Sequence, residues 1–157
     1  MKKVRYEDLK HEERVLVKMA EKARKNAYAP YSKYKVGAAL IADNGKIYSG
    51  CNVENAAYKV PHAEENAIQA MASDGGREII MLCCMAENGG IPCGSCRQFI
   101  WEFCGNDPSV KIIGVDSKRN VHITTIGELL PYPFGPKNLG VDPKKYQNKT
   151  ANKKVLT

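Results

Sequence analysis

Apolar and polar residues alternate along this chain with two different periods. Over residues 7–27 the apolar positions recur at helical spacing with charged residues between them, as in an amphipathic helix. Residues 36–42 and 46–52 instead have the character of strands, and Asp43-Asn44-Gly45 between them is typical of a tight hairpin turn. The first third of the chain therefore predicts one helix followed by an antiparallel hairpin.

The rest of the chain alternates helical and strand patterns. Helical periods cover residues 63–74 and 95–104, whereas residues 79–86 and 110–115 are nearly continuous apolar runs, as in strands buried on both faces. Thr125, followed three residues later by a glutamate, predicts the capped start of a last short helix. This order predicts an α/β fold, a three-layer α-β-α sandwich around a mixed sheet whose first hairpin is antiparallel.

Length and composition fit one globular domain. The 157 residues, 43% of them hydrophobic, are enough to form a single sizeable core. The charged start lacks the apolar stretch of an export signal, and the longest apolar run, residues 79–86, is too short to cross a bilayer. We therefore expect a cytoplasmic protein without membrane association.

The net charge of +7 is concentrated near the C-terminus. Residues 140–157 carry five lysines and one aspartate, so they contribute +4 of the total. A lysine-rich and asparagine-rich segment with little apolar content is typical of a flexible tail. We therefore divide the chain into a domain at residues 1–139 and a basic, flexible tail at residues 140–157. Because the domain itself is only weakly basic, we do not expect a nucleic-acid partner.

Two short motifs contain the residues suited to catalysis. The tripeptide H-A-E contributes His62 and Glu64, and the pentapeptide P-C-G-S-C contributes Cys93 and Cys96. One imidazole and two thiolates are ligands that zinc prefers, and they leave a fourth tetrahedral position open for water. Glu64 is placed to act as a base toward that water. The order H-x-E, then P-C-x-x-C, is the signature of zinc nucleobase deaminases. The motifs therefore predict one catalytic Zn²⁺ per chain.

The position and charge of this site agree with that interpretation. Both motifs fall at predicted helix starts, where unpaired backbone N–H groups favour anionic thiolates. Two helices packed on one sheet face would bring the three ligands to one point. Zn²⁺ with two thiolates and a neutral imidazole has no net charge, which should make it a stronger Lewis acid than a three-thiolate site.

Two other interpretations of the cysteines stay open at this point. Cys93 and Cys96 form a C-x-x-C pair, which also occurs in thiol–disulfide proteins. A structural zinc site that stabilises an interaction module is the second alternative, but it would need a fourth protein ligand and gives Glu64 no role. Cys83 and Cys84, within an apolar run, are expected to be small buried residues.

Beyond these motifs, the chain resembles the short, single-domain cytidine deaminases over roughly residues 11–139. The resemblance rests on an ordered set of blocks. They are A-Y-A-P-Y-S at 27–32 running into V-G-A-A-L at 36–40, G-C-N-V-E-N-A-A-Y at 50–58, H-A-E at 62–64, P-C-G-S-C-R-Q at 92–98, and L-L-P to F-G-P at 129–136.

The resemblance implies roles for further residues. Asn52 and Glu54 would hold the ribose hydroxyls of a nucleoside, Tyr34 would lie beside the pyrimidine, and the Ala63 backbone would bind the base edge. Phe134 would reach into a neighbouring subunit's site and stack on its base. This implies a homo-oligomer with shared sites, a tetramer with a dimer as the alternative. The alternative role for Tyr34 and Phe134 is packing in the hydrophobic core. The alternative for Asn52 is that of a turn residue after the strand.

Three features depart from the family pattern. His62 stands where short members usually have cysteine, Glu65 stands where they usually have arginine, and the segment between Tyr58 and His62 is one residue shorter. The first two changes fit together, because a neutral metal site does not need a nearby cation. The third borders the expected substrate.

The resemblance implies a reaction as well as a fold. It implies hydrolytic deamination of cytidine and 2'-deoxycytidine to uridine and 2'-deoxyuridine, with release of ammonia, in pyrimidine salvage. The short segment before His62, together with Tyr34, leaves a modified cytosine nucleoside or a blasticidin-like analogue as the alternative substrate.

Overall fold

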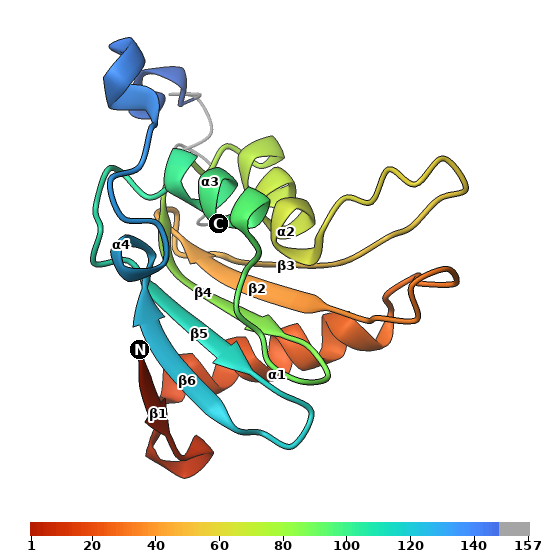
Figure 1. Cartoon of the computed structure of the whole chain (residues 1–157). Helices are drawn as coiled ribbons and strands as arrows, with labels where there is room; N and C mark the ends of the chain where they lie inside the picture. Colours follow the sequence, from red (N-terminus) through yellow and green to blue (C-terminus); the bar gives the residue numbers. More distant parts are fainter. Residues whose placement is uncertain (148–157) are drawn as a thin grey trace, which may run out of the picture.

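A six-stranded sheet forms the centre of the computed structural model, which describes residues 1–147 (Figure 1). The strand order is β1-β6-β5-β4-β2-β3. Strands β4 and β5 are parallel, and the other neighbouring pairs are antiparallel, so the sheet is mixed and open. The strands are β1 (Lys2–Val4), β2 (Gly37–Ala42), β3 (Ile47–Cys51), β4 (Ile79–Met85), β5 (Lys111–Val115) and β6 (Val121–Thr125).

Helices cover both faces of this sheet. Helix α1 (His11–Lys25) lies on one face, and α2 (Ala63–Ser73) and α3 (Gly94–Glu102) lie next to each other on the opposite face (Figure 1). The predicted three-layer α-β-α sandwich with an antiparallel first hairpin is confirmed. The short elements are α4 (Ile126–Leu129) and the 3-10 turns η1 (Tyr6–Asp8), η2 (Pro136–Leu139) and η3 (Pro143–Tyr146).

Each face of the sheet has its own hydrophobic cluster, because successive side chains of a strand point to opposite faces. On β2, Leu40 packs with α2 and α3, whereas Ala39 packs with α1. At Gly37 a Cβ would collide with the backbone of Ala20 and Arg24, so glycine permits α1 to lie directly against the start of β2. This close approach brings the end of α1 next to the site described below.

The sequence-predicted elements differ from the structure mainly at their ends. The first helix begins at His11 rather than residue 7, because Lys10 is its extended N-cap and η1 precedes it. Thr125 and Glu128 form the expected capping box at the start of α4. The edge strand β1 was not predicted. Within residues 1–147, no helix has the length and apolarity needed to cross a membrane.

Residues 140–147, the described part of the expected tail, contact the domain. Lys144 forms an ion pair with Glu78 at 2.6 Å, and the Gln147 amide donates to Asp43 at 2.9 Å. The remainder of the expected tail, residues 148–157, lies outside the described residues. A domain boundary at residue 139 and a flexible tail beyond it therefore stay predictions.

Candidate metal centre and adjoining pocket

The starts of α2 and α3 bring three candidate metal ligands together. His62 is the N-cap of α2, Cys93 is the N-cap of α3, and Cys96 lies in the first turn of α3. The His62 Nδ1 atom lies 3.3 Å from each cysteine Sγ, and the three ligand atoms lie within 4.8 Å of one another. Ligands bound tetrahedrally to zinc at ordinary bond lengths are about 3.5 Å apart. The cluster therefore fits zinc bound through Nδ1 and two sulfurs.

Glu65 joins the two ligand-bearing helix starts. Its Oε2 accepts the backbone N–H of His62 at 2.9 Å, which completes a capping box, and its Oε1 accepts from the Ser95 hydroxyl of α3 at 3.4 Å. The carboxylate also lies in the first turn of α2, where the helix dipole favours negative charge. Glu65 thus has a structural role at the position where short relatives were expected to have arginine.

Arg97 fixes the loop that precedes Cys93. Its Nε donates to the Pro92 carbonyl at 2.8 Å, and Nη1 donates to the Leu129 carbonyl at 3.0 Å. A planar guanidinium holds both acceptors in one rigid arrangement. These two contacts help to set the direction in which the chain enters Cys93.

The thiol of Cys96 is buried beside a carboxylate. Burial raises the pKa of this thiol, and the nearby charges of Glu64 and Cys93 raise it further. Zinc binds the thiolate form, so metal binding releases the thiol proton and the affinity of the site for zinc should increase with pH.

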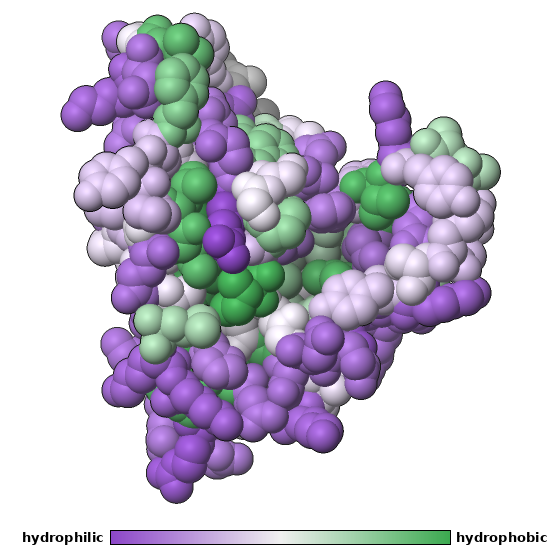
Figure 2. Space-filling view, viewed as in Figure 1, coloured by the Kyte–Doolittle hydropathy of each residue, from purple (hydrophilic) through white to green (hydrophobic). Residues whose placement is uncertain are grey.

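A pocket of about 320 Å³ opens beside the cluster, a volume typical of small-molecule sites. Figure 2 shows apolar side chains gathered in the hollow near the centre of this face. Four segments supply the lining, from residues 32–36, 52–54, 60–64 and 84–93. The structure brings most of the sequence-predicted site residues to this pocket, namely Tyr34, Asn52, Glu54, His62, Ala63, Glu64 and Cys93.

Glu64 is buried in the pocket wall next to the metal cluster. It is 4% exposed and lies in the first turn of α2, two residues after His62. Its Oε1 accepts a weak hydrogen bond from the Cys84 thiol, with an S···O distance of 3.4 Å. The carboxylate therefore lines the pocket, where it can reach a bound molecule.

Cys84 has a place in this site that sequence analysis did not assign. As expected it is buried, but it also lines the pocket and contacts Glu64. The available signal was strand alternation on β4. Cys83 belongs to the cluster under α1, so its neighbour Cys84 must face α2 and the pocket.

Asn52 and Glu54 hold the backbone of the pocket wall. The Asn52 Oδ1 accepts the Val36 N–H at 2.9 Å, and its Nδ2 donates to the Tyr34 carbonyl at 2.8 Å. The Glu54 carboxylate accepts the backbone N–H groups of Tyr31, at 2.8 Å, and Ser32, at 3.2 Å. The Ser32 side chain, and after it these two backbone N–H groups, lower the pKa of Glu54. Each side chain keeps unused hydrogen-bonding capacity toward the pocket.

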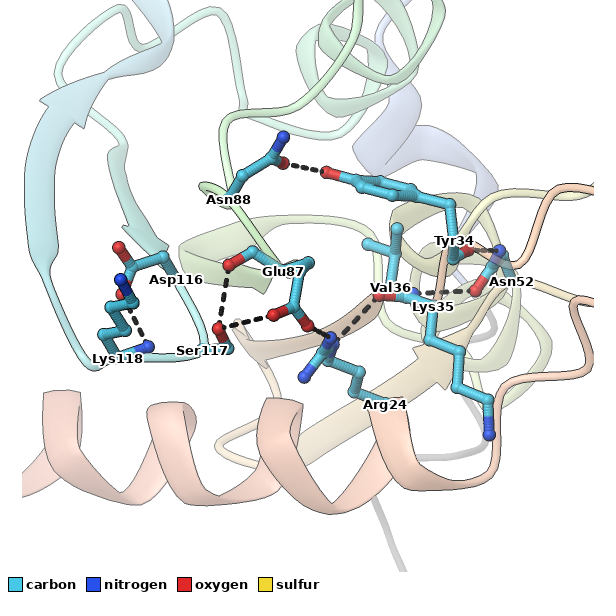
Figure 3. A network of polar contacts seen from close by, with 10 residues as sticks. All are labelled: Arg24, Tyr34, Lys35, Val36, Asn52, Glu87, Asn88, Asp116, Ser117 and Lys118. Atoms are coloured by element: carbon cyan, nitrogen blue, oxygen red, sulfur yellow. Dashed lines mark hydrogen bonds and ion pairs between the residues drawn. The ribbon is translucent and has the colours of Figure 1, made fainter.

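Tyr34 and Phe134 have different surroundings. Tyr34 lines the pocket, and its hydroxyl donates to Asn88 Oδ1 at 2.8 Å (Figure 3). Phe134 is 59% exposed and does not line this pocket of its own chain, and its carbonyl accepts from the Gln98 amide at 2.7 Å. Core packing therefore does not account for Phe134.

Comparisons with known proteins agree with this geometry. A family model described as the cytidine and deoxycytidylate deaminase zinc-binding region matches residues 10–111. A cytidine deaminase of Sporosarcina psychrophila is 43% identical over 127 residues, which are 79% of this chain and 92% of the relative.

Solved structures give the same result. The crystal structure of cytidine deaminase from Burkholderia pseudomallei has a TM-score of 0.73 at 37% identity, and covers 80% of this chain and 100% of its own. The enzyme from Mycobacterium tuberculosis has a TM-score of 0.68 at 36% identity, and covers 80% of this chain and 99% of its own. Both the sequence match and the shared fold extend over most of the molecule, and this chain therefore belongs to the cytidine deaminase family of hydrolases.

Proposed function

We propose that this protein is a zinc-dependent enzyme that hydrolyses cytidine and 2'-deoxycytidine to uridine and 2'-deoxyuridine. The observation that carries the proposal is the position of Glu64. Its carboxylate lies in the wall of a nucleoside-sized pocket, beside His62 and the two cysteines that complete the cluster. Membership of the cytidine deaminase family supports this reaction over other uses of the same ligands.

The proposed mechanism assigns proton transfer to Glu64. When held by His62, Cys93 and Cys96, zinc would supply a Lewis acid that lowers the pKa of water to about 7. Glu64 takes a proton from this water and delivers it to ring nitrogen N3 as the oxygen adds to C4. Glu64 then carries the second proton, from the hydroxyl group now on C4, to the departing amine. The C4–N bond breaks, and the products are uridine and ammonia.

Substrate binding is assigned to the pocket that adjoins the candidate metal ligands. Asn52 and Glu54 would bind the ribose hydroxyls with the capacity that their backbone contacts leave free. The Ala63 backbone, at the start of α2, would bind the C2–N3 edge of the base. Exposed Phe134 would complete the site of a neighbouring subunit in a homotetramer. Pyrimidine salvage in the cytoplasm is the setting that we propose.

The alternative of a C-x-x-C redox pair gains no support from the site. His62 Nδ1 faces both sulfurs at 3.3 Å, which is the arrangement that a shared cation requires. The alternative of a modified cytosine nucleoside concerns the same chemistry. It is decided by comparing ammonia release from cytidine, 2'-deoxycytidine and such analogues.

Replacement of Glu64 tests the assigned role. We expect Glu64→Gln to retain about one zinc per chain and to lose activity by about 10²–10⁴-fold. The matched control is Glu65→Gln, the same chemical change at the next residue, which caps α2 and does not line the pocket. Conversion of cytidine is followed by ultraviolet absorbance, and zinc by metal analysis. Near-normal turnover by zinc-loaded Glu64→Gln would contradict the mechanism, and a wild-type protein inactive on every cytosine nucleoside would contradict the function.

A further inference from the structure

One hydrogen bond joins two segments that meet at the pocket. The Tyr34 hydroxyl donates to Asn88 Oδ1 at 2.8 Å (Figure 3). Tyr34 precedes β2, whereas Asn88 follows β4, so the two residues come from distant parts of the chain. Tyr34 lines the pocket, and so does Gly89, the neighbour of Asn88. The bond therefore links two walls of one cavity.

The tyrosine end of this bridge is held by its own backbone contacts. The Tyr34 carbonyl accepts from Asn52 Nδ2 at 2.8 Å, and the Asn52 Oδ1 accepts the Val36 N–H at 2.9 Å. Between them, the Lys35 carbonyl accepts from Arg24 Nε at 2.9 Å. The backbone of residues 34–36 is thus held by Asn52, which follows β3, and by Arg24 of α1. The backbone that carries the phenol is therefore fixed, and the bond to Asn88 is what holds the ring itself in place.

The asparagine end is held equally firmly. Arg24 Nη2 pairs with the Glu87 carboxylate at 2.6 Å, and the Ser117 hydroxyl donates to the same carboxylate at 3.0 Å (Figure 3). At Gly90, three residues after Glu87, a Cβ would collide with the Cys84 carbonyl, so this loop lies directly on β4. Arg24 therefore contacts both segments that the Tyr34–Asn88 bond connects.

The bond depends on the hydroxyl of Tyr34. Burial raises the pKa of the Tyr34 phenol, so the group stays protonated and donates at neutral pH. Phenylalanine would fill the same volume but could not make this contact. The bridge therefore requires both the Tyr34 hydroxyl and the Asn88 side chain.

The proposed binding mode indicates which part of a substrate this wall faces. With the C2–N3 edge of cytosine on the start of α2, the opposite C5–C6 edge faces the other segments that line the pocket. Those segments are residues 32–36, which include Tyr34, and residues 84–93, which include Gly89 and adjoin Asn88. We propose that the Tyr34–Asn88 bridge limits the size of the substituent at pyrimidine C5, and so restricts substrates to cytosine nucleosides with hydrogen or a small group there. This inference rests on the proposed deaminase function.

The size limit follows from the rigidity of the wall. A hydrogen-bonded bridge between two fixed segments cannot widen to admit a linear or branched substituent. Without the bond, the Tyr34 ring can rotate about its side-chain torsions and the cavity can enlarge. One extra methylene group in a fixed apolar pocket typically changes kcat/KM by about 10–200-fold.

The test compares kcat/KM for cytidine and for 5-propynylcytidine. We expect the wild type to favour cytidine strongly, and Asn88→Ala and Tyr34→Phe each to raise the relative rate for the 5-propynyl compound by about tenfold. Tyr34→Phe keeps the ring and removes only the hydroxyl, so it covers the case in which Asn88→Ala folds poorly. The double variant should show no more than the larger single effect, because both changes remove the same bond.

Asn44→Ala is the matched control. Asn44 also bonds a tyrosine hydroxyl, that of Tyr48 at 2.7 Å, but on the β2–β3 hairpin outside the pocket lining. The Asn44→Ala variant should show the same ratio of kcat/KM values for the two substrates as the wild type. If cytidine is deaminated and all variants share the wild-type ratio, or if the two single effects add fully, the bridge does not set the limit. If the wild type deaminates no cytosine nucleoside, the proposed function fails and this inference with it.

Discussion

Replacement of Asn52 by alanine should destabilise the fold as well as alter the pocket. The Asn52 side chain is 6% exposed and satisfies two backbone groups, the Val36 N–H at 2.9 Å and the Tyr34 carbonyl at 2.8 Å. Alanine removes both partners and supplies none. A buried polar group left without a partner costs roughly 1–3 kcal/mol. Both backbone groups are partly buried, so we expect a total loss of about 2–3 kcal/mol in the free energy of unfolding.

A loss of that size is readily measured. Domains of this length unfold with about 5–15 kcal/mol, and about 2–3 kcal/mol corresponds to a decrease in Tm of roughly 5–10 °C. Urea titrations followed by circular dichroism should compare wild type and Asn52→Ala at one protein and one zinc concentration, because bound metal and subunits shift apparent stability. Asn44→Ala, on the exposed hairpin, is the control and should lose less than about 1 kcal/mol.

A small change in the free energy of unfolding would contradict the structural role of Asn52. If Asn52→Ala unfolds within about 0.5 kcal/mol of the wild type, water or a backbone shift satisfies both groups. Asn52 would then have no structural role beyond the Asn44 control, and the fixed position of Tyr34 would need another explanation. If stability falls as expected while the KM for cytidine is unchanged, the proposed ribose contact of Asn52 is contradicted instead.

Three further changes test other contacts. Glu65→Ala should lower the free energy of unfolding by about 1 kcal/mol through loss of the α2 capping box, whereas Glu65→Gln should retain most of it, as thermal denaturation can show. Cys84→Val should reduce kcat more than Cys84→Ser, because valine cannot donate a hydrogen bond to Glu64 and crowds its carboxylate. Equal kcat values for the two variants would show that the Cys84–Glu64 contact does not affect catalysis. At Glu13, burial acts to raise the pKa, but hydrogen bonds from Lys111 and the Lys10 backbone outweigh it, so the pKa is lowered. The stability from that ionised carboxylate is present above its ordinary pKa of 4.5 and is lost as pH falls through the lowered value. Lys111→Met should therefore cost roughly 1–2 kcal/mol at pH 7 and flatten the decline below pH 4.5, and an unchanged pH profile in urea titrations would contradict this.

The layered fold could be predicted because its signals are local. The hairpin turn near Gly45, the apolar run at β4 and the helix stop after α2 each depend on a few neighbouring residues. Strand β1 gave no such signal. Its three residues include Lys2 and Lys3, and it exists as a strand because β6 offers an edge to pair with. A pairing between the two ends of the domain leaves no periodic pattern in the sequence.

The clustering of the three candidate metal ligands could be predicted for a similar reason. These residues lie in two short sequence motifs, each at the start of a helix. Asn88 could not be recognised in this way, since its partner Tyr34 is distant in the chain and the contact arises only when β2 and β4 pair. Glu65 was recognised by position but not by role. Its capping contact with His62 depends on the conformation of one N-cap residue.

The two ligand-bearing helices begin with nearly the same local backbone. His62 has φ −76° and ψ 164°, and Cys93 has φ −69° and ψ 171°. An extended residue at this position accepts an imidazole or a thiol without any change in the helix that follows. Exchange of the ligand at residue 62 would therefore alter the charge of the metal site by one unit while leaving the scaffold intact. One substitution could thus change the acidity of the centre without changing the architecture that holds it.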